Sequence, residues 1–389
     1  MTDALRDEVR AWLAAHWTGP AADEAAARAW LAKVVEARWA VPRWPVEWGG
    51  RALPDAEARI IEAEFAALGA PGTGQDRTNL YANTLLAFGT QALKERLLLR
   101  MLRGEVPMCL LYSEPNAGSD LAGLRCRAER RDGQWVVNGQ KVWTSYAAVA
   151  EYGMLVARTD WDAPKHRGIS FFFCPMRQPG VEVRPLRQIT GESRFNEVFL
   201  TDALIPEENL LGQPGQGWAV LQTALAYERS VMGEAARGPR SGVAEGTGEP
   251  PLIALAREAG RLGDPVLRQD LARVLAYRAL NALNTARAKA DLAQGTSSPL
   301  MSLGKLAMSR ILHEEARLRT AILGPESLFE GPEHPRAEDA NFLTLNAYFT
   351  SIGGGTDQIQ RNIIGERVLG LPREPEVDRD LPFRQVRSQ

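Results

Sequence analysis

The most informative stretch of the chain is Tyr112-Ser-Glu-Pro-Asn-Ala-Gly-Ser-Asp-Leu-Ala-Gly123, in which small and hydroxyl-bearing residues predominate. Its serine hydroxyls and the backbone amides around Gly118 are donors suited to a pyrophosphate or to the edge of a heteroaromatic ring. Further along, Trp143-Thr-Ser145 adds an aromatic face on which such a ring can stack. The stretch therefore predicts a site for a flat cofactor that carries phosphate. A glycine- and serine-rich surface loop beside an ordinary buried tryptophan is the alternative.

Residues 112–123 resemble the first signature of the acyl-CoA dehydrogenase family, a hydroxyl residue followed by Glu-Pro-x-x-Gly-Ser-Asp-x-x-Gly. Other stretches resemble further motifs of that family in the same order: Pro45 with Trp48-Gly-Gly50, Asn138–Ser145, Pro206–Gly212 and Gly355–Arg373. Because these motifs span nearly the whole chain in register, the chain is identified as a member of the family. The resemblance implies an α+β fold with an N-terminal helical domain, a middle β-barrel or sandwich-like domain and a C-terminal four-helix bundle.

The residue pattern divides the chain into the same three parts, with boundaries near 107 and 215. Residues 1–107 place apolar and charged side chains at helical spacing, as Ala56, Ile60, Ala63 and Ala67 illustrate. Residues 108–215 contain short β-rich runs. Helical spacing returns over residues 216–389. We therefore expect helices, then a sheet, then a helical bundle.

Turn signals refine this prediction. The pairs Asp132-Gly133 and Asn138-Gly139 bracket a short apolar run, so both are predicted to be hairpin-type turns. The runs 168–176 and 181–186 are predicted strands. Residues 238–251 are rich in glycine, serine and proline, and we expect a mobile loop there between two long helices.

The overall composition narrows the class of protein. A chain of 389 residues with 45% hydrophobic residues can bury the large core of one multi-layered subunit. Its formal net charge of −2 provides no basic field, so nucleic acid is not an implied partner. Cys109, Cys126 and Cys174 form no Cys-x-x-Cys pair, which indicates neither a zinc site nor a disulfide framework. A reducing compartment fits this usage.

The N-terminal residues indicate where the protein acts. Charged residues such as Asp3, Arg6 and Arg10 interrupt the apolar positions, as in an amphipathic surface helix and unlike a signal peptide. No apolar run approaches the length of a transmembrane helix. We therefore expect a cytoplasmic protein without membrane insertion.

The family resemblance implies a reaction, the α,β-dehydrogenation of an acyl-CoA thioester with FAD as cofactor and an electron-transfer flavoprotein as electron acceptor. In this chemistry a carboxylate removes a proton from the carbon next to the carbonyl. Because such a C–H is very weakly acidic, the site needs a base shielded from water and donors directed at the thioester oxygen.

The expected base departs from the commonest family pattern. The usual position of the catalytic glutamate is occupied by Gly354, which has no side chain to accept a proton. Some family members place the base on the helix after the β-domain, just before an arginine, and Glu228 has that position here. Its helical spacing with Leu221 and Ala224 places Glu228 in an apolar stripe, where desolvation would raise its pKa and strengthen it as a base. A structural ion pair with an arginine of a neighbouring helix is the alternative.

The resemblance also assigns the remaining site residues. The isoalloxazine and diphosphate of FAD are expected to contact Leu110, Tyr112, Ser113, Gly118 and Ser119, and the ring edge near N5 is expected to contact Trp143, Thr144 and Ser145. Thr356 is predicted to cap the helix that starts near Asp357, and the resemblance implies that FAD also contacts Thr356, Asp357 and Gln358. The expected thioester or pantetheine contacts are Ser119, Arg229 and Gly355, and the backbone amide of Gly354 is expected to polarise the thioester carbonyl.

A second departure concerns the far end of FAD. Typical family homotetramers carry an Arg-x-x-Phe-Gly element that reaches a neighbouring subunit's cofactor, but residues 257–269 lack the Phe-Gly pair. Related bacterial enzymes with Gly-Gly-Gly-Thr include α2β2 heterotetramers. Both a homo-oligomer (dimer or tetramer) and an α2β2 assembly therefore stay open. So do two functional alternatives: a catalytically silent subunit that completes a partner's cofactor site, and a same-fold flavoenzyme acting on a carrier-protein thioester.

Overall fold

The computed structural model describes residues 2–235, 249–293 and 300–386, except for the side chains of residues 2, 228–235, 289, 292, 293 and 301. The chain forms two compact units. Unit 1 comprises the residues up to Gln188, Ser193–Val231 and the C-terminal stretch from Val377, whereas unit 2 comprises Ile189–Glu192 and Met232–Glu376. Each unit is described separately below.

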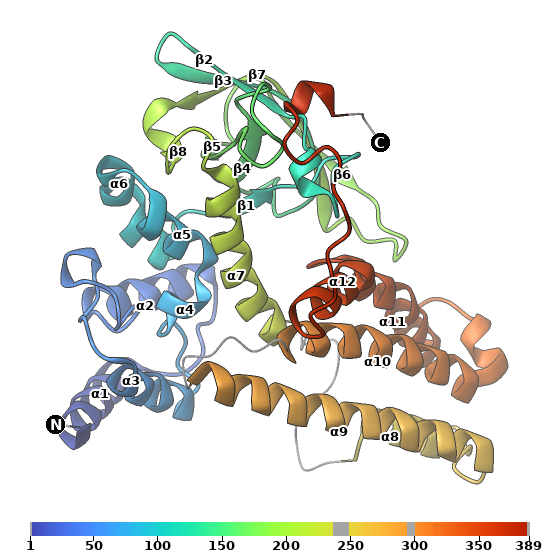
Figure 1. Ribbon diagram of the computed structural model, residues 1–389. Coiled ribbons are helices and arrows are strands. Elements are labelled where there is room, and N and C mark those ends of the chain that lie inside the picture. The colour runs from blue at the N-terminus through green and yellow to red at the C-terminus, as the bar shows by residue number, and fades with distance from the viewer. Residues whose placement is uncertain (1, 236–248, 294–299, 387–389) are drawn as a thin grey trace. The chain divides into compact units, whose positions relative to one another are not determined.

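Helices build the first part of unit 1 (Figure 1). Asp23, Asn79 and Thr90 cap three of them, each accepting a hydrogen bond from a backbone amide of the first turn. The described elements are α1 (Thr2–His16), α2 (Glu24–Glu36), η1 (Val46–Trp48), α3 (Asp55–Ala67), α4 (Gln75–Thr78), α5 (Leu80–Phe88) and α6 (Gln91–Leu102).

An open, mostly antiparallel sheet follows. Along the main path the strand order is β6-β7-β3-β2-β4-β5-β8, with β1 paired in parallel to β4. The sheet is not closed into a barrel, because β6 and β8 end this path without pairing with each other. The strands are β1 (Met108–Leu111), β2 (Arg127–Arg131), β3 (Gln134–Ser145), β4 (Tyr152–Arg158), β5 (Ile169–Pro175), β6 (Val181–Leu186), β7 (Phe195–Pro206) and β8 (Leu210–Leu211).

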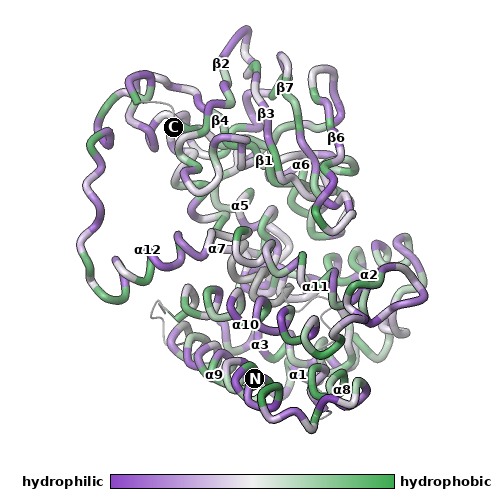
Figure 2. Tube along the Cα trace, turned by 90° about the vertical axis from the view of Figure 1, so that its right-hand side faces the viewer, coloured by the Kyte–Doolittle hydropathy of each residue, from purple (hydrophilic) through white to green (hydrophobic). Residues whose placement is uncertain are grey.

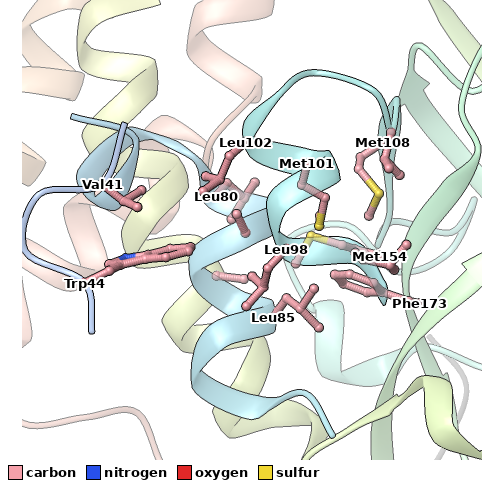
Figure 3. Packing of buried hydrophobic residues seen from close by; sticks show 14 of the residues in the cluster. Val41, Trp44, Leu80, Leu85, Leu98, Met101, Leu102, Met108, Met154 and Phe173 are labelled. Carbon is pink, nitrogen blue, oxygen red and sulfur yellow. The ribbon is translucent and has the colours of Figure 1, made fainter. Parts of the chain in front are cut away.

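One hydrophobic core joins the helices of unit 1 to one face of its sheet. Figure 3 shows Leu98 and Met101 of α6 beside Met154 of β4 and Phe173 of β5, and these four side chains are almost completely buried. Burial of apolar surface is the main favourable term in folding, at about 25 cal/mol per Å². The N-terminal helices and the sheet therefore fold as one body.

Helix α7 and three short 3-10 turns remain to be described. After η3 (Glu207–Asn209), helix α7 (Gly217–Ala235) begins in unit 1 against β5. Gly217 is required there, since a Cβ atom would lie 2.5 Å from the carbonyl carbon of Ser170. The short turns η2 (Leu121–Gly123) and η6 (Phe383–Gln385) also belong to unit 1.

Unit 2 is helical, and its helices carry hydrophilic and hydrophobic residues side by side (Figure 2). A core of leucine, isoleucine and valine from α8, α9 and α10 holds it together, with Ala340 added by α11. The described elements are α8 (Pro251–Glu258), α9 (Pro265–Ala293), α10 (Leu300–Leu323), η5 (Gly324–Leu328), α11 (Pro335–Ile352) and α12 (Asp357–Arg367).

The structure corrects one predicted turn. Asp132-Gly133 does form the turn between β2 and β3, with both residues at positive φ. Asn138-Gly139 does not, because β3 continues through it and the extra residue lies on β7, where Asp202 has a φ of 50°. Gly139 is required for another reason, since a Cβ atom there would lie 2.8 Å from the Cα atom of Cys126.

Two further expectations have different outcomes. The predicted strands at 168–176 and 181–186 are confirmed as β5 and β6. The expected mobile loop at 238–251 falls mainly on residues 236–248, which lie outside the described residues.

Candidate functional site

We call residues 112–123 the serine loop. It leaves β1 and makes a tight turn in which Glu114 and Ala117 exchange two backbone hydrogen bonds, of 3.0 and 3.1 Å. Gly118 and Ser119 are exposed beyond this turn, and Ser113 is half-buried. The loop thus presents backbone amides and hydroxyls to its surroundings, as the sequence predicts for an anion-binding loop.

Leu110 and Tyr112 lie deeper than the rest of this group. Leu110 is half-buried on β1, and the Tyr112 side chain is buried, with its hydroxyl 3.8 Å from the sulfur of Met154. The Tyr112 ring packs edge-on against Phe171, with ring centroids 6.0 Å apart. Tyr112 is therefore part of the core beneath the serine loop, and its backbone carbonyl accepts a hydrogen bond from Lys141.

Trp143 stands on a β-bulge at the end of β3. Val142 and Trp143 together face Glu197 of β7, and the backbone of Trp143 has a φ of 62°. Such left-handed backbone is unfavourable for a bulky residue and persists only where the surroundings enforce it. The indole is 59% exposed, and it touches Phe195 edge-on, with ring centroids 6.0 Å apart. The strained bulge therefore holds a large aromatic face outward.

The bulge is held by a buried amide. Asn196, 6% exposed, donates from Nδ2 to the Thr144 carbonyl at 2.9 Å. The Thr144 side chain points into the sheet and is fully buried, whereas Ser145 is half-buried. The Thr144 hydroxyl is buried and has no hydrogen-bond partner among the described residues. Of the three predicted residues at this strand end, Trp143 and Ser145 thus have the more accessible side chains.

A buried ion pair ties the serine loop to β3. The Lys141 ammonium is fully buried, and it lies 2.8 Å from the Glu114 carboxylate and 3.1 Å from the Tyr112 carbonyl. Glu114 also accepts the backbone amides of Arg125 at 2.7 Å and Cys126 at 2.9 Å. A charged group without water needs this full set of partners.

Two further features lie beside this ion pair. The backbone amide of Val142 donates to the Ser113 carbonyl at 2.9 Å, so the structure brings Ser113 and Trp143 together. Burial raises the pKa of the neighbouring Cys126 thiol to about 11, which keeps that thiol neutral beside the pair. Glu114, Lys141 and Asn196 were not predicted from sequence, although a lysine at an inward-facing strand position is a signal that could have been used.

Glu228 and Arg229 lie on α7, and their side chains are outside the described residues. The predicted apolar stripe is present up to that point, since Leu221 and Ala224 are fully buried. The helical period places position 228 on the face that these two residues share.

The remaining predicted residues lie in unit 2, at the start of α12. Thr356 caps this helix, as predicted, by accepting the Ile359 amide at 3.2 Å. Asp357 is already engaged, because its carboxylate accepts from the Ser309 hydroxyl at 2.8 Å and lies 3.3 Å from the Lys305 ammonium on α10. Gln358 is exposed.

The glycines before α12 have backbone that few other residues adopt. Gly354 and Gly355 have φ angles of 64° and 90°. A Cβ atom on Gly355 would also lie 2.9 Å from the side-chain nitrogen Nε2 of Gln360. Gly355 is therefore required by the turn itself, whatever else it contacts.

Comparison with known proteins identifies the family. Residues 2–105, 109–203 and 215–369 match, in turn, the N-terminal, middle and C-terminal domains of acyl-CoA dehydrogenases. The chain belongs to the acyl-CoA dehydrogenase family. Members of this family are FAD-dependent oxidoreductases, and the expected order of helical, sheet and helical parts is confirmed.

Among the relatives of this chain are acyl-CoA dehydrogenases of mycobacteria. IpdE1 of Mycolicibacterium smegmatis is 36% identical over 95% of this chain and 98% of its own length. FadE34 of Mycobacterium tuberculosis is 40% identical over 85% of this chain, but the match spans only 44% of FadE34.

Solved structures give the same fold. A protein described as the Tcur3481-Tcur3483 steroid ACAD has a TM-score of 0.71 at 26% identity, covering 96% of this chain and 98% of its own. A chain of the ChsE4-ChsE5 complex from Mycobacterium tuberculosis has a TM-score of 0.66 at 29% identity, with 96% and 98% covered.

The serine loop offers a test of whether its residues fit FAD. Gly118 has ordinary backbone φ, and a Cβ atom there would meet no atom of the protein within 4 Å. Nothing in the folded chain therefore requires a glycine at this position, which fits a site where another molecule approaches the backbone. Together with the outward-facing Trp143, this is a loop and stacking surface that a flavin can use. Among the residues that the structure describes, no helix is long and apolar enough to cross a membrane.

Proposed function

We propose that this protein catalyses the FAD-dependent α,β-dehydrogenation of an acyl-CoA thioester. The serine loop and Trp143 are its flavin-binding elements, and Ser113, Gly118, Ser119 and Ser145 are the donors. When bound, FAD supplies the acceptor for the hydride that leaves the β-carbon. Membership of the acyl-CoA dehydrogenase family supports this proposal.

One observation of the chain's own geometry supports it most. The Val142–Ser113 hydrogen bond and the Lys141–Glu114 ion pair join the serine loop, with its open glycine and its serines, to the end of β3 that carries an exposed, strained tryptophan. Strain of this kind clusters at functional sites, where the surrounding structure maintains it. A plain surface loop would need neither the buried ion pair nor the left-handed tryptophan.

Glu228 is the proposed base. Its place on the face of α7 shared with buried Leu221 and Ala224 favours a desolvated carboxylate, and desolvation strengthens a carboxylate as a base. It would take the proton from the carbon next to the thioester carbonyl. Gly354, Gly355, Ser119 and Arg229 are proposed, from the family resemblance, to bind the thioester or pantetheine arm, with the Gly354 amide donating to the thioester oxygen.

Substitution of the base tests this assignment. Glu228→Gln keeps the volume of the side chain and removes its basicity, so reduction of the bound flavin by an acyl-CoA should slow about 10²–10⁴-fold. Stopped-flow absorbance under anaerobic conditions measures that rate, and a binding titration checks that FAD and thioester are still bound. Glu258→Gln, an exposed carboxylate on α8, is the matched control and should reduce at the normal rate. Normal reduction in Glu228→Gln would reject the assignment.

The assembly is a second proposal. We propose an oligomer in which either identical or unlike subunits complete the FAD site, with Thr356, Asp357 and Gln358 among the residues that contact FAD. The likeness to a chain of the ChsE4-ChsE5 complex favours unlike subunits. The lack of a Phe-Gly pair in residues 257–269 favours them too. The native mass of the protein, purified alone and after co-expression with an acyl-CoA dehydrogenase-like partner, distinguishes the two assemblies.

The electron acceptor and the substrate class complete the proposal. Electrons would leave through an electron-transfer flavoprotein. Acyl-CoAs with straight, branched and ring-bearing chains, together with a carrier-protein thioester, form the panel that separates a dehydrogenase of CoA esters from a flavoenzyme acting on carrier-protein thioesters. The ring-bearing substrates belong in it because one structural relative is described as a steroid ACAD.

A further inference from the structure

A buried arginine donates a hydrogen bond to the end of the serine loop. Arg158, the last residue of β4, is fully buried, and its guanidinium donates to the backbone carbonyls of Ala122 at 2.7 Å, Leu124 at 3.1 Å and Lys165 at 3.1 Å. In the part of the chain that the structure describes, no carboxylate forms an ion pair with Arg158, although the charges of Glu114, Asp120 and Asp160 act on it from a greater distance. Burial lowers the pKa of Arg158 to about 10, so the group still carries its charge at neutral pH. A buried charge in this state depends on its carbonyl partners and on whatever else covers it.

An aromatic ring from the C-terminal end of the chain provides that cover. The Phe383 ring is 2% exposed, and its centroid lies 3.3 Å from the guanidinium carbon of Arg158. The guanidinium carbon of Arg125, two residues after the serine loop, lies 5.3 Å from the same centroid. The face of an aromatic ring attracts a cation, and the attraction is stronger where water is absent.

We call residues 382–386 the C-terminal strap. It is fixed to the loop between β4 and β5, because the amides of Phe383 and Arg384 donate to the carbonyls of Ala163 and Trp161, each at 3.0 Å. Arg384 also forms an ion pair with Asp162. Figures 1 and 2 both place this stretch of the chain next to the strands of unit 1. The strap therefore belongs to the same body as the serine loop.

Two of the three carbonyls that accept hydrogen bonds from Arg158 lie at the end of the serine loop or directly after it. Ala122 lies in the turn η2, which directly follows Ser119 and Asp120, and Leu124 follows that turn. The exposed side of the same turn is tied by the Lys165–Asp120 ion pair, with a distance of 2.6 Å. The contacts of Arg158 and Lys165 thus fix the end of the loop, directly after the exposed Gly118 and Ser119.

We propose that Phe383 is a positioning residue for the flavin site: by covering Arg158 it keeps the end of the serine loop in its cofactor-binding shape. Without the ring, water reaches the guanidinium and competes with the carbonyls of Ala122 and Leu124 for its N–H groups. The loop then loses its fixed position although none of its own residues has changed. This inference rests on the proposed function for its consequence, the binding of FAD, but the positioning of the loop is measurable without flavin.

Hydrogen–deuterium exchange of the flavin-free protein tests the positioning directly. In Phe383→Ala and Phe383→Leu, backbone amides of residues 113–125 should exchange about tenfold faster than in the unchanged protein, while β4 and β5 keep their protection. Phe383→Tyr retains the ring and should restore the slow exchange. Phe329→Ala, which removes an aromatic ring that is 51% exposed in unit 2, is the control and should change nothing in this loop.

Flavin titration measures the consequence. The dissociation constant for FAD should rise about tenfold or more in Phe383→Ala and Phe383→Leu, and stay near normal in Phe383→Tyr. If Phe383→Ala does not fold, Arg384→Gln loosens the strap at the surface and should give a smaller rise in exchange, confined to residues 113–125. Unchanged exchange in the serine loop of the folded variants, or equal behaviour of Phe383→Leu and Phe383→Tyr, would overturn the proposal. A protein whose loop loosens as expected but whose unchanged form binds no FAD would refute the proposed function and not the role of Phe383.

Discussion

Gly118 is a glycine that the folded chain itself does not require. A Cβ atom there would meet nothing within 4 Å, so Gly118→Ala should leave the flavin-free protein equally stable or more stable by about 0.4–1 kcal/mol. If FAD lies against this backbone, the added methyl group should weaken its binding about 5- to 150-fold, because overpacking costs about 1–3 kcal/mol. Thermal unfolding and flavin titration measure the two effects.

A glycine-to-alanine change elsewhere serves as the control. Gly304 lies inside α10, and a Cβ atom there would only touch the Asn281 side chain at 3.7 Å. Gly304→Ala should therefore stabilise the helix by up to about 1 kcal/mol and leave FAD binding unchanged. Equal FAD affinity in Gly118→Ala and the unchanged protein would show that the serine loop is not a cofactor loop.

Lys141 ties the serine loop to β3 through its buried ion pair with Glu114. Lys141→Met leaves the Glu114 carboxylate without its cation, and removing one partner of a buried pair costs about 3–5 kcal/mol. The variant should unfold at lower denaturant concentration and lose flavin on purification. Lys33→Met, at an exposed lysine of α2, is the control, and its free energy of unfolding should change by less than about 0.5 kcal/mol. A Lys141→Met protein with normal stability would contradict the importance of the pair.

For single residues, the sequence predicts contacts that depend on local chemistry and misses those that depend on the tertiary fold. The cap at Thr356 follows from local chemistry, because a hydroxyl before a helix has one favoured partner. The Lys141–Glu114 pair does not, since it depends on which strand faces the loop in three dimensions. Phe383 and Arg158 are separated by more than half of the chain, so no local pattern could connect them.

Among the elements, helix α1 is attached to α3 by charge. Arg6 and Arg10 both bind the Glu64 carboxylate, at 3.0 and 2.8 Å, and the hydrogen bond from Arg10 is the main cause that lowers the pKa of Glu64 below its ordinary value of 4.5. A carboxyl group with a lowered pKa in the folded state stabilises that state above its ordinary pKa, and loses this effect as the pH falls through the folded pKa.

The attachment of α1 should therefore depend on pH. Glu64→Gln should make α1 more accessible to limited proteolysis at pH 7. The difference from the unchanged protein should be constant between pH 6 and 8, and should shrink once the pH falls below 4.5. A difference that persists undiminished at pH 3 would mean that charge does not hold α1 in place.

Element types were predictable where the local pattern is strong. The strands β5 and β6 follow from short β-rich runs between turn signals. The Asn138-Gly139 prediction is wrong, because Asn-Gly also suits a strand position where a neighbouring backbone approaches closely, as Cys126 approaches Gly139. The open edges of the sheet were not predicted either, since closure depends on pairing between β6 and β8, which no local signal encodes.

At the scale of the whole molecule, the order of helical, sheet and helical parts follows from the sequence because each part has its own periodicity. The return of the chain from unit 2 to unit 1 at Val377 has no such signal. The helical spacing expected up to residue 389 does not extend to residues 369–381, which carry many charged and proline residues and form neither helix nor strand. The end of this segment is fixed by tertiary contacts, namely the packing of Phe383 on Arg158 and the backbone hydrogen bonds of Phe383 and Arg384.

Whether the isolated chain carries a reducible flavin decides between an acyl-CoA dehydrogenase and a subunit that only completes a partner's cofactor site. We expect the purified protein to show the absorbance bands of bound FAD, and we expect anaerobic addition of one member of the acyl-CoA panel to bleach them. A protein that is colourless alone and gains flavin only with a partner subunit would support the cofactor-completing alternative. A flavin that no acyl-CoA or carrier-protein thioester bleaches would contradict the proposed dehydrogenation.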